Sequence, residues 1–354
     1  MSDRCSHGGI YSVDNPRSVK SDFSSNINPL GVSKKVIEAI QKNVCTVASL
    51  YPDPRCTDLK KHLLNYLGID LTLECISVGN GATEIIHNFA RAFVNDRVII
   101  PSPTFCEYEV ASQRMHAQIL FVPLKNFRVD AELVIERAKK QDAVFLCNPN
   151  NPTGLLSTYE IKKIVEGIEP PTKVLIDESF IEFVDPTHSQ SSMVDKVKEF
   201  DNLVVLRSMT KSFGLAGLRL GYSISNPKLA GQLFANTIHW NVNGIAQIAG
   251  IAALKDVKHL AKGRAIIKKE REYMYSYMKK NLHSFKPIRS DANYFLIHLQ
   301  NKDSLQARDS MLLRNGVLVR DCSNFRGMGR EYIRVAVRKH RENLLLLDAM
   351  ELVD

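Results

Sequence analysis

A single lysine stands in a stretch rich in glycine and small hydroxyl side chains, residues 208–222, which read SMTKSFGLAGLRLGY. Lys211 follows Ser208 by three residues and precedes Arg219 by eight, and the stretch contains no carboxylate that could pair with it. A lysine that lies near cationic groups or away from water loses its proton more readily and becomes nucleophilic. The spacing therefore predicts a reactive amine in a loop whose small residues allow close approach to the backbone.

Other polar or aromatic residues also follow short apolar segments. Residues 79–83 read GNGAT and lead into a helical pattern, as a phosphate-binding helix start does, although this motif alone favours an ordinary capped helix. The ring of Phe105 either stacks on a flat cofactor or belongs to the hydrophobic core. Residues 148–154, NPNNPTG, predict a rigid turn in which the Asn151 amide donates to a ligand. Asp177 ends an apolar segment, so its carboxylate needs a partner or caps the next segment.

The candidate residues can meet only if the strands and helices that carry them are arranged in one sheet. Strands are predicted at residues 75–78, 97–100, 119–122, 143–147, 173–176, 203–206 and 221–223. A helix is predicted at residues 83–93, where apolar residues recur on one face. Such alternation predicts a mainly parallel sheet with helices on both faces, and ligands bind such sheets at the carboxyl ends of the strands.

The pattern changes near residue 245. Helices are predicted at 244–254 and 260–282, then strands at 294–299, 317–320 and 332–337. We therefore expect an N-terminal arm over residues 1–30, a large domain over 31–243 whose first helix packs with the small domain, and a small α+β domain over 244–354.

The composition is that of a folded globular protein with 354 residues and a net charge of +9. The basic residues are dispersed, which favours a small anionic substrate over nucleic acid. No apolar run of membrane-spanning length and no leader pattern is found, so we expect a cytoplasmic protein without membrane contact. The seven cysteines show no C-x-x-C spacing, which fits unpaired thiols in a reducing compartment and argues against a disulfide framework or a zinc site.

Together the five strand ends match the needs of pyridoxal phosphate. That cofactor needs a lysine for its Schiff base, a carboxylate at its ring nitrogen, an arginine and backbone donors at its phosphate, and a ring to stack on. The motifs N-P-T-G, D-E and S-x-T-K-x7-R resemble those of the fold-type-I PLP-dependent aminotransferase superfamily (class I/II), and the resemblance covers nearly the whole chain. It implies an α/β fold with a seven-stranded, mixed but mostly parallel sheet between helices and a smaller α+β C-terminal domain.

The resemblance also implies residue roles. Lys211 and Asp177 would be catalytic. The implied cofactor contacts are Ala82, Thr83, Phe105, Asn151, Asp177, Ser208, Thr210, Lys211 and Arg219. Tyr51 would reach the phosphate of the neighbouring subunit's cofactor, which implies a homodimer with shared sites. One departure is Phe180, where many relatives carry a tyrosine that contacts the cofactor's ring oxygen.

Two phosphate-handling branches compete: threonine-phosphate decarboxylases of the cobalamin pathway and histidinol-phosphate aminotransferases. The segments at 7–9 (HGG), 22–31 (DFSSNINPLG), 177–183 (DESFIEF), 240–243 (WNVN) and 319–325 (VRDCSNF) resemble the decarboxylases. Some relatives carry a cysteine-rich metal-binding tail; this chain ends without one, so we expect no metal.

The substrate residues follow from the same resemblance and from strand geometry. The predicted substrate contacts are His7, Asn26, Asn151, Arg320, Arg334 and Arg338. Alternate residues of a strand share a face, so Arg334 and Arg338 are expected to face one pocket and bind a substrate with both a carboxylate and a phosphate. The ordinary alternatives are a solvated terminus for His7 and surface ion pairs for the arginines.

We therefore expect decarboxylation of L-threonine O-3-phosphate to (R)-1-aminopropan-2-ol O-phosphate. Histidinol-phosphate transamination is the alternative enzyme. A non-catalytic ligand-sensing module is the alternative of another class, and the presence of both Lys211 and Asp177 argues against it.

Overall fold

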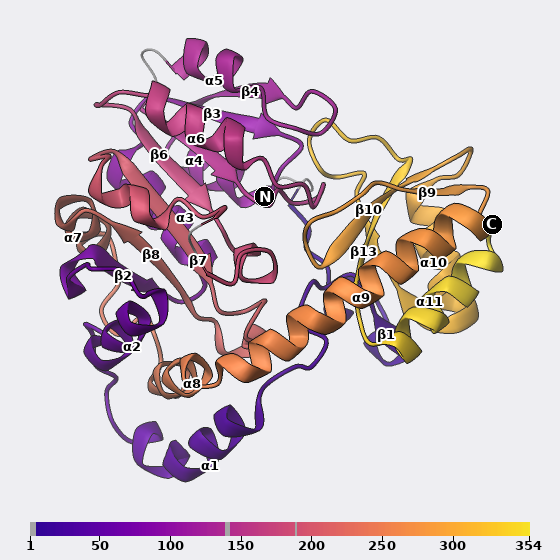
Figure 1. Cartoon of the computed structure of the whole chain (residues 1–354), viewed down its shortest axis with the longest axis horizontal. Coiled ribbons are helices and arrows are strands. Elements are labelled where there is room, and N and C mark those ends of the chain that lie inside the picture. Colours follow the sequence, from indigo (N-terminus) through magenta and orange to yellow (C-terminus); the bar gives the residue numbers. More distant parts are fainter. Residues whose placement is uncertain (1–4, 139–141, 188–189) are drawn as a thin grey trace.

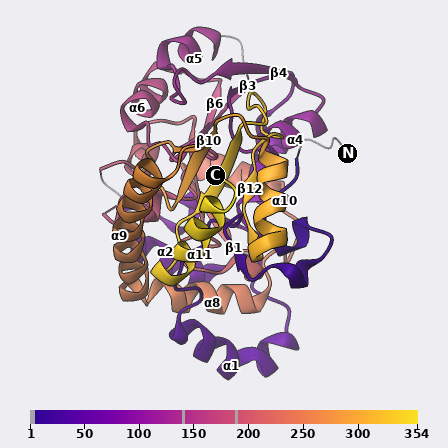
Figure 2. The same ribbon diagram turned by 90° about the vertical axis from the view of Figure 1, so that its right-hand side faces the viewer.

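The computed structural model describes residues 5–138, 142–187 and 190–354. A seven-stranded sheet with its helices forms one body, and a four-stranded sheet flanked by α9, α10 and α11 forms the other (Figure 1). The long helix α9 (Val257–Asn281) runs from the large body to the small one. Helix α1 (Lys34–Ala48) contacts α8 (Gly244–Leu254) and lies at the same end of the molecule in both views (Figure 2).

The large sheet has the strand order β2-β8-β7-β6-β5-β3-β4. Its strands are β2 (Ile76–Gly79), β3 (Arg97–Ser102), β4 (Gln118–Pro123), β5 (Ala143–Cys147), β6 (Lys173–Asp177), β7 (Leu203–Ser208) and β8 (Gly221–Ser225). Strand β8 is antiparallel to both neighbours, and the pairs among β3 to β7 are parallel. The expected mixed, mostly parallel seven-stranded sheet is confirmed.

Two helical layers cover this sheet because alternate residues of each central strand face opposite sides. Val144 and Ile176 join a core with α2 (Thr57–Leu67), α5 (Ala131–Ala138), α6 (Thr158–Gly167) and α8. Phe145 and Leu175 join a second core with α3 (Ala82–Phe93), α4 (Glu107–Arg114) and α7 (Pro227–Ala235). The strands are therefore apolar on both faces, and polar side chains collect at their ends.

The small body contains β9 (Phe285–Pro287), β10 (Tyr294–Leu299), β12 (Arg320–Asp321) and β13 (Tyr332–Ala336), all paired antiparallel. Its helices α9, α10 (Ser304–Asn315) and α11 (His340–Glu351) pack around a core that includes Phe295 and Val335. Gly316 ends α10 with a φ of 70°, a left-handed conformation that glycine adopts readily.

The N-terminal arm is built into the small body. Strand β1 (Ser21–Asp22) pairs in parallel with β11 (Val317–Leu318), and Phe23 lies in the small-body core. The strand expected at 317–320 is therefore two strands, because β11 pairs with β1 and β12 pairs with β13. The domain boundaries at 30 and 243 stay a prediction. Among the described residues, no helix combines the length and hydrophobicity needed to cross a membrane.

Candidate active site

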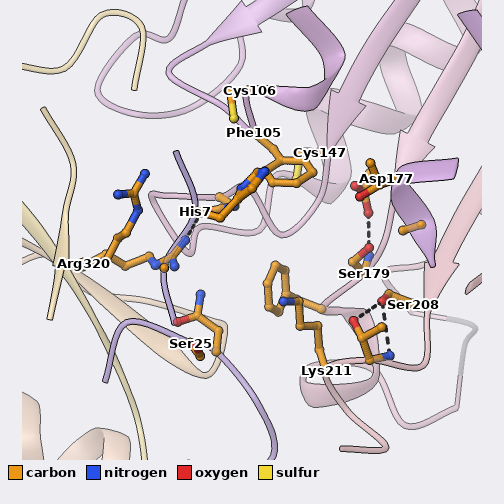
Figure 3. Close-up of a pocket in the computed structure, with 18 of the residues that line it drawn as sticks. His7, Ser25, Phe105, Cys106, Cys147, Asp177, Ser179, Ser208, Lys211 and Arg320 are labelled. Carbon is orange, nitrogen blue, oxygen red and sulfur yellow. Dashed lines mark hydrogen bonds between the residues drawn. The ribbon is translucent and has the colours of Figure 1, made fainter. Parts of the chain in front are cut away.

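A cavity of about 320 Å³ lies where the carboxyl ends of the parallel strands meet the arm and the small-body sheet (Figure 3). Nine of the ten residues assigned above to the cofactor line it: Ala82, Thr83, Phe105, Asn151, Asp177, Ser208, Thr210, Lys211 and Arg219. Five of the six residues assigned to the substrate also line it: His7, Asn26, Asn151, Arg320 and Arg334. The fold thus gathers residues that are more than 300 positions apart in the sequence.

Lys211 follows β7 and is half-buried in the cavity wall. Its amine has no hydrogen bond or ion pair with a described residue. Burial, together with the charges of Arg334 and Arg219, lowers the pKa of Lys211 to about 8, although Asp177 acts in the opposite direction. A substantial fraction of this amine is therefore neutral near pH 8, which is the form that attacks a carbonyl carbon.

Asp177 ends β6, where its carboxylate is buried but hydrogen-bonded. Tyr108 of α4 donates to Oδ2 at 2.7 Å, and the Ser179 backbone N–H donates to Oδ1 at 2.9 Å. Burial raises the pKa of Asp177, whereas the hydrogen bonds from Ser179 and Tyr108 oppose that rise. The position of this carboxylate is therefore fixed before any ligand binds.

A cradle for an anion lies at the start of α3. The Ser208 and Thr210 hydroxyls lie 2.7 Å apart, and Arg219 approaches Gly81, the residue before α3. A Cβ built on Gly81 would lie 2.6 Å from an Arg219 guanidinium nitrogen, so a side chain there would displace the guanidinium. Helix-start N–H groups, two hydroxyls and a guanidinium suit a phosphate group.

The side walls of the cavity come from loops after β3, β5 and β6. Figure 3 shows Asp177, Ser179 and Ser208 on one side, Arg320 and Ser25 on the other, and Lys211 between them. The position often occupied by tyrosine in relatives holds Phe180, whose ring packs edge-on against Tyr294 at 5.0 Å between centroids. Phe180 has no hydroxyl, so it cannot donate a hydrogen bond to a ligand.

Two guanidiniums form the small-body wall. Arg320 of β12 and Arg334 of β13 are direct cross-strand partners, both are buried, and neither has an ion pair with a described carboxylate. Arg334 donates to the Asn151 side-chain oxygen and, at 2.9 Å, to the Ser24 carbonyl oxygen, and its Nε has no partner. Burial lowers the pKa of both arginines, and that of Arg320 falls to about 10.

The arm closes the remaining side. Arg320 donates to the Ser6 carbonyl oxygen at 2.6 Å. His7 Nε2 lies 2.9 Å from Glu107 Oε1, and its ring lies 5.7 Å from the Phe105 ring. Hydrogen bonds with His7 and His87 lower the pKa of Glu107 to about 2. Asn26 is buried in the cavity wall, and its side-chain oxygen has no partner among the described residues.

Two predicted site residues lie outside the cavity. The expectation that Arg338 faces the same pocket as Arg334 is wrong, because β13 ends at Ala336 and the chain then turns into α11. Arg338 instead pairs with Glu342 at 2.6 Å. Tyr51 is 81% exposed and stacks on Trp240 with 4.7 Å between ring centroids. Its predicted contact with a neighbouring subunit stays a prediction.

The expectation that every cysteine is unpaired is also wrong, because Cys5 and Cys106 form a disulfide. The arm folds back onto the start of α4, and local spacing gives no sign of this contact between positions 101 residues apart. Sequence reasoning also assigned no site role to seven uncharged cavity residues, although four of them lie in segments that it singled out. The seven residues are Ser6, Ser24, Ser25, Cys106, Cys147, Ser179 and Phe325.

Comparison with known proteins identifies the family. Residues 18–349 match the family described as aminotransferase class I and II. The chain belongs to this family. Its members depend on pyridoxal phosphate, and the cavity fits that cofactor because it combines a half-buried lysine with a lowered pKa, a fixed carboxylate and an anion cradle.

Several relatives share most of the chain. A protein of Caldanaerobacter subterraneus subsp. tengcongensis named "Putative threonine-phosphate decarboxylase" is 37% identical over 331 residues, which cover 92% of this chain and 88% of that protein. The solved structure of the histidinol-phosphate aminotransferase from Clostridium acetobutylicum has a TM-score of 0.87 and 33% identity, covering 94% of this chain and 98% of that one. The L-threonine-O-3-phosphate decarboxylase from Porphyromonas gingivalis has a TM-score of 0.83 and 26% identity, covering 94% and 99%. The relatives thus include both branches considered from the sequence.

Proposed function

We propose that this chain is a threonine-phosphate decarboxylase that converts L-threonine O-3-phosphate into (R)-1-aminopropan-2-ol O-phosphate for cobalamin biosynthesis. The observation that carries the proposal is the pair Arg320 and Arg334, two buried guanidiniums without a carboxylate partner among the described residues. Buried charges need partners, so this pair calls for an anionic ligand. A substrate with both a carboxylate and a phosphate supplies two anionic groups.

The cavity residues have different roles in the proposed reaction. When bound, pyridoxal phosphate supplies the electron sink for the pair left by bond cleavage at the substrate α-carbon. Ser208, Thr210 and Arg219 hold an anionic group at the α3 start, which leaves Arg320 and Arg334 for the substrate's anions. The Lys211 amine, neutral above its lowered pKa, acts as nucleophile and then as the proton carrier at the α-carbon.

The choice between decarboxylation and transamination depends on substrate orientation. Loss of the carboxylate requires that the α-carbon–carboxylate bond, rather than the α-carbon–hydrogen bond, is held in the reactive direction. Anchoring the substrate phosphate on the small-body wall, between Arg320 and Arg334, supports that orientation. The phenyl ring of Phe180 adds no hydrogen bond that would hold the carboxylate in another position.

A product assay tests this proposal. Purified enzyme with pyridoxal phosphate is expected to release CO2 from L-threonine O-3-phosphate without any 2-oxo acid. The same preparation is assayed with histidinol phosphate and 2-oxoglutarate. Glutamate formation that needs 2-oxoglutarate, with no release of CO2, would assign the chain to histidinol-phosphate transamination instead. That alternative is favoured by the similarity to the Clostridium acetobutylicum enzyme.

The proposal includes a cytoplasmic homodimer with shared sites. Tyr51 is exposed beside Trp240 and lines no part of the cavity of its own subunit, so its phenol is free to reach a neighbouring subunit's cofactor phosphate. Reaction of either substrate would also contradict a role as a non-catalytic module.

A further inference from the structure

Four potential metal ligands from two distant segments meet beside the cavity. Cys5 and His7 come from the arm, and Cys106 and Glu107 come from the start of α4. One ligand atom from each of the four lies within 4.8 Å of the other three. The spacing of the cysteines hides this group in the sequence, since Cys5 and Cys106 are 101 positions apart and neither belongs to a C-x-x-C motif.

The ligand types suit zinc, and the two sulfurs can move apart to zinc-binding positions once the disulfide is reduced. Two thiolates, one imidazole and one carboxylate form a soft and borderline donor set of the kind that binds zinc tetrahedrally. Zinc–ligand bonds of about 2.0–2.3 Å place tetrahedral ligands roughly 3.3–3.8 Å apart. Cys5 Sγ lies 3.6 Å from Glu107 Oε1 and 3.9 Å from His7 Nε2. His7 Nε2 and Glu107 Oε1, at 2.9 Å, need to separate only slightly.

A further side chain, that of His87, supports the proposed ligand Glu107. His87 Nε2 of α3 lies 3.1 Å from Glu107 Oε2, the carboxylate oxygen that does not face His7. His87 and Glu107 are mostly buried, with 11% and 13% of their side chains exposed. A hydrogen bond to the outer oxygen of a ligating carboxylate fixes its orientation, as in known metal sites. The site is therefore more than a chance group of surface side chains.

We propose that the reduced chain binds one zinc ion through Cys5, His7, Cys106 and Glu107. In the disulfide form the two sulfurs are joined and are not available as thiolates. A dithiol or phosphine reductant delivers two electrons, the S–S bond breaks, and two protons complete the two thiols. Zinc then binds the two sulfurs and displaces both thiol protons to solvent.

A bound zinc ion would hold the N-terminal arm in place when the disulfide is reduced. Ser6 lies between two of the ligands, and its carbonyl oxygen accepts a hydrogen bond from Arg320. Phe105 directly precedes Cys106. The ion would therefore attach the arm to α4 in the reducing compartment, where the disulfide does not persist, and would hold Ser6 and His7 at the cavity rim.

The test uses the full-length holoenzyme in two redox states. One sample is reduced with a phosphine and freed of reductant, the other is oxidised, and both are titrated anaerobically with Co²⁺. Intense visible d–d bands of tetrahedral cobalt, read away from the cofactor's absorption, are expected in the reduced sample at one ion per chain and to be absent from the oxidised one. Zn²⁺ is expected to displace cobalt from the reduced protein.

Variants locate the ion. Cys5→Ser and Cys106→Ser should each abolish the bands, and His87→Ala should weaken zinc binding by roughly 10- to 100-fold through the lost outer hydrogen bond. Cys45→Ser removes an exposed free cysteine of α1 and should leave binding unchanged. Bound pyridoxal phosphate in every variant verifies that it is folded. The proposal is overturned if the reduced enzyme gives no tetrahedral cobalt spectrum, or if the spectrum survives both Cys5→Ser and Cys106→Ser.

Discussion

Arg320 and Arg334 lie directly opposite each other on β12 and β13, and together they place two buried positive charges on one wall of the cavity. Cross-strand like charges repel each other, so this arrangement lowers stability unless an anion lies between them. The positive charge of Arg334 also acts on Lys211, because it lowers the pKa of the Lys211 amine. Substrate binding and lysine chemistry are therefore coupled through one guanidinium.

Removing Arg334 should harm catalysis far more than removing Arg338. Arg334→Ala takes a buried donor from the anion site, so kcat/KM is expected to fall by roughly a hundredfold, on the scale of about 3 kcal/mol. Arg338→Ala is the matched control, because its guanidinium pairs with Glu342 outside the cavity, and kcat/KM should stay close to that of the wild type. Steady-state kinetics with the phosphorylated substrate measure both. Equal effects of the two changes would contradict the assigned anion site.

Lys211→Ala should abolish turnover while the protein remains folded. The change removes the only reactive amine among the residues that line the described cavity, but it takes little apolar surface from the core. The circular dichroism spectrum should be unchanged, and pyridoxal phosphate should still bind without a covalent link through Ser208, Thr210 and Arg219. Borohydride treatment followed by mass spectrometry should label Lys211 in the wild type and no lysine in the variant. Wild-type turnover in Lys211→Ala would refute this role.

Covalent capture of pyridoxal phosphate should depend on pH through the lowered pKa of Lys211. The neutral amine is the reactive form, so the capture rate of the apoenzyme should rise with pH and level off above about 8, instead of rising toward the usual lysine value of 10.5. The rate is measured by borohydride trapping at short times. Arg334→Ala removes one positive charge, and its midpoint should therefore move to higher pH. A midpoint near 10.5 in the wild type would show that the amine is not perturbed.

Asp177 and Tyr108 should contribute unequally to catalysis. Asp177→Asn removes the charge that holds the cofactor's ring nitrogen protonated, and kcat should fall by a hundredfold or more, roughly 3 kcal/mol. Tyr108→Phe removes only the 2.7 Å hydrogen bond to Asp177 and should lower kcat by about tenfold, the scale of one hydrogen bond to a charged group. A defect of Asp177→Asn confined to KM would count against the assignment.

Tyr51→Phe tests the shared site. The variant should remain a dimer by sedimentation, yet bind pyridoxal phosphate roughly tenfold more weakly, because one hydrogen bond to a charged phosphate is lost. Tyr159→Phe, a substitution at an exposed tyrosine of α6, serves as the control. Unchanged cofactor affinity in Tyr51→Phe, or a monomeric wild type, would contradict the contact between subunits.

Local sequence patterns were sufficient to predict the large sheet and most of the residues that line the cofactor cavity. Asp177 ends an apolar strand, and Lys211 and Asn151 follow two others. Parallel strands bring their carboxyl ends to one edge of a sheet, so local patterns predict that these residues lie together. The predicted bounds 143–147, 244–254 and 294–299 coincide with β5, α8 and β10. In these segments, the local sequence pattern and side-chain burial favour the same conformation.

The position of the arm and the set of arginines in the cavity depend on long-range packing, which local patterns do not predict. Strand periodicity predicted that Arg338 would join Arg334, but β13 ends first, and a nearby carboxylate on α11 pairs with Arg338. The meeting of Cys5 with Cys106, and of His7 with Glu107 and His87, depends on long-range packing of the arm against α3 and α4. Contacts between segments a hundred residues apart leave no local periodicity in the sequence, because the residues between them fold independently of the contact.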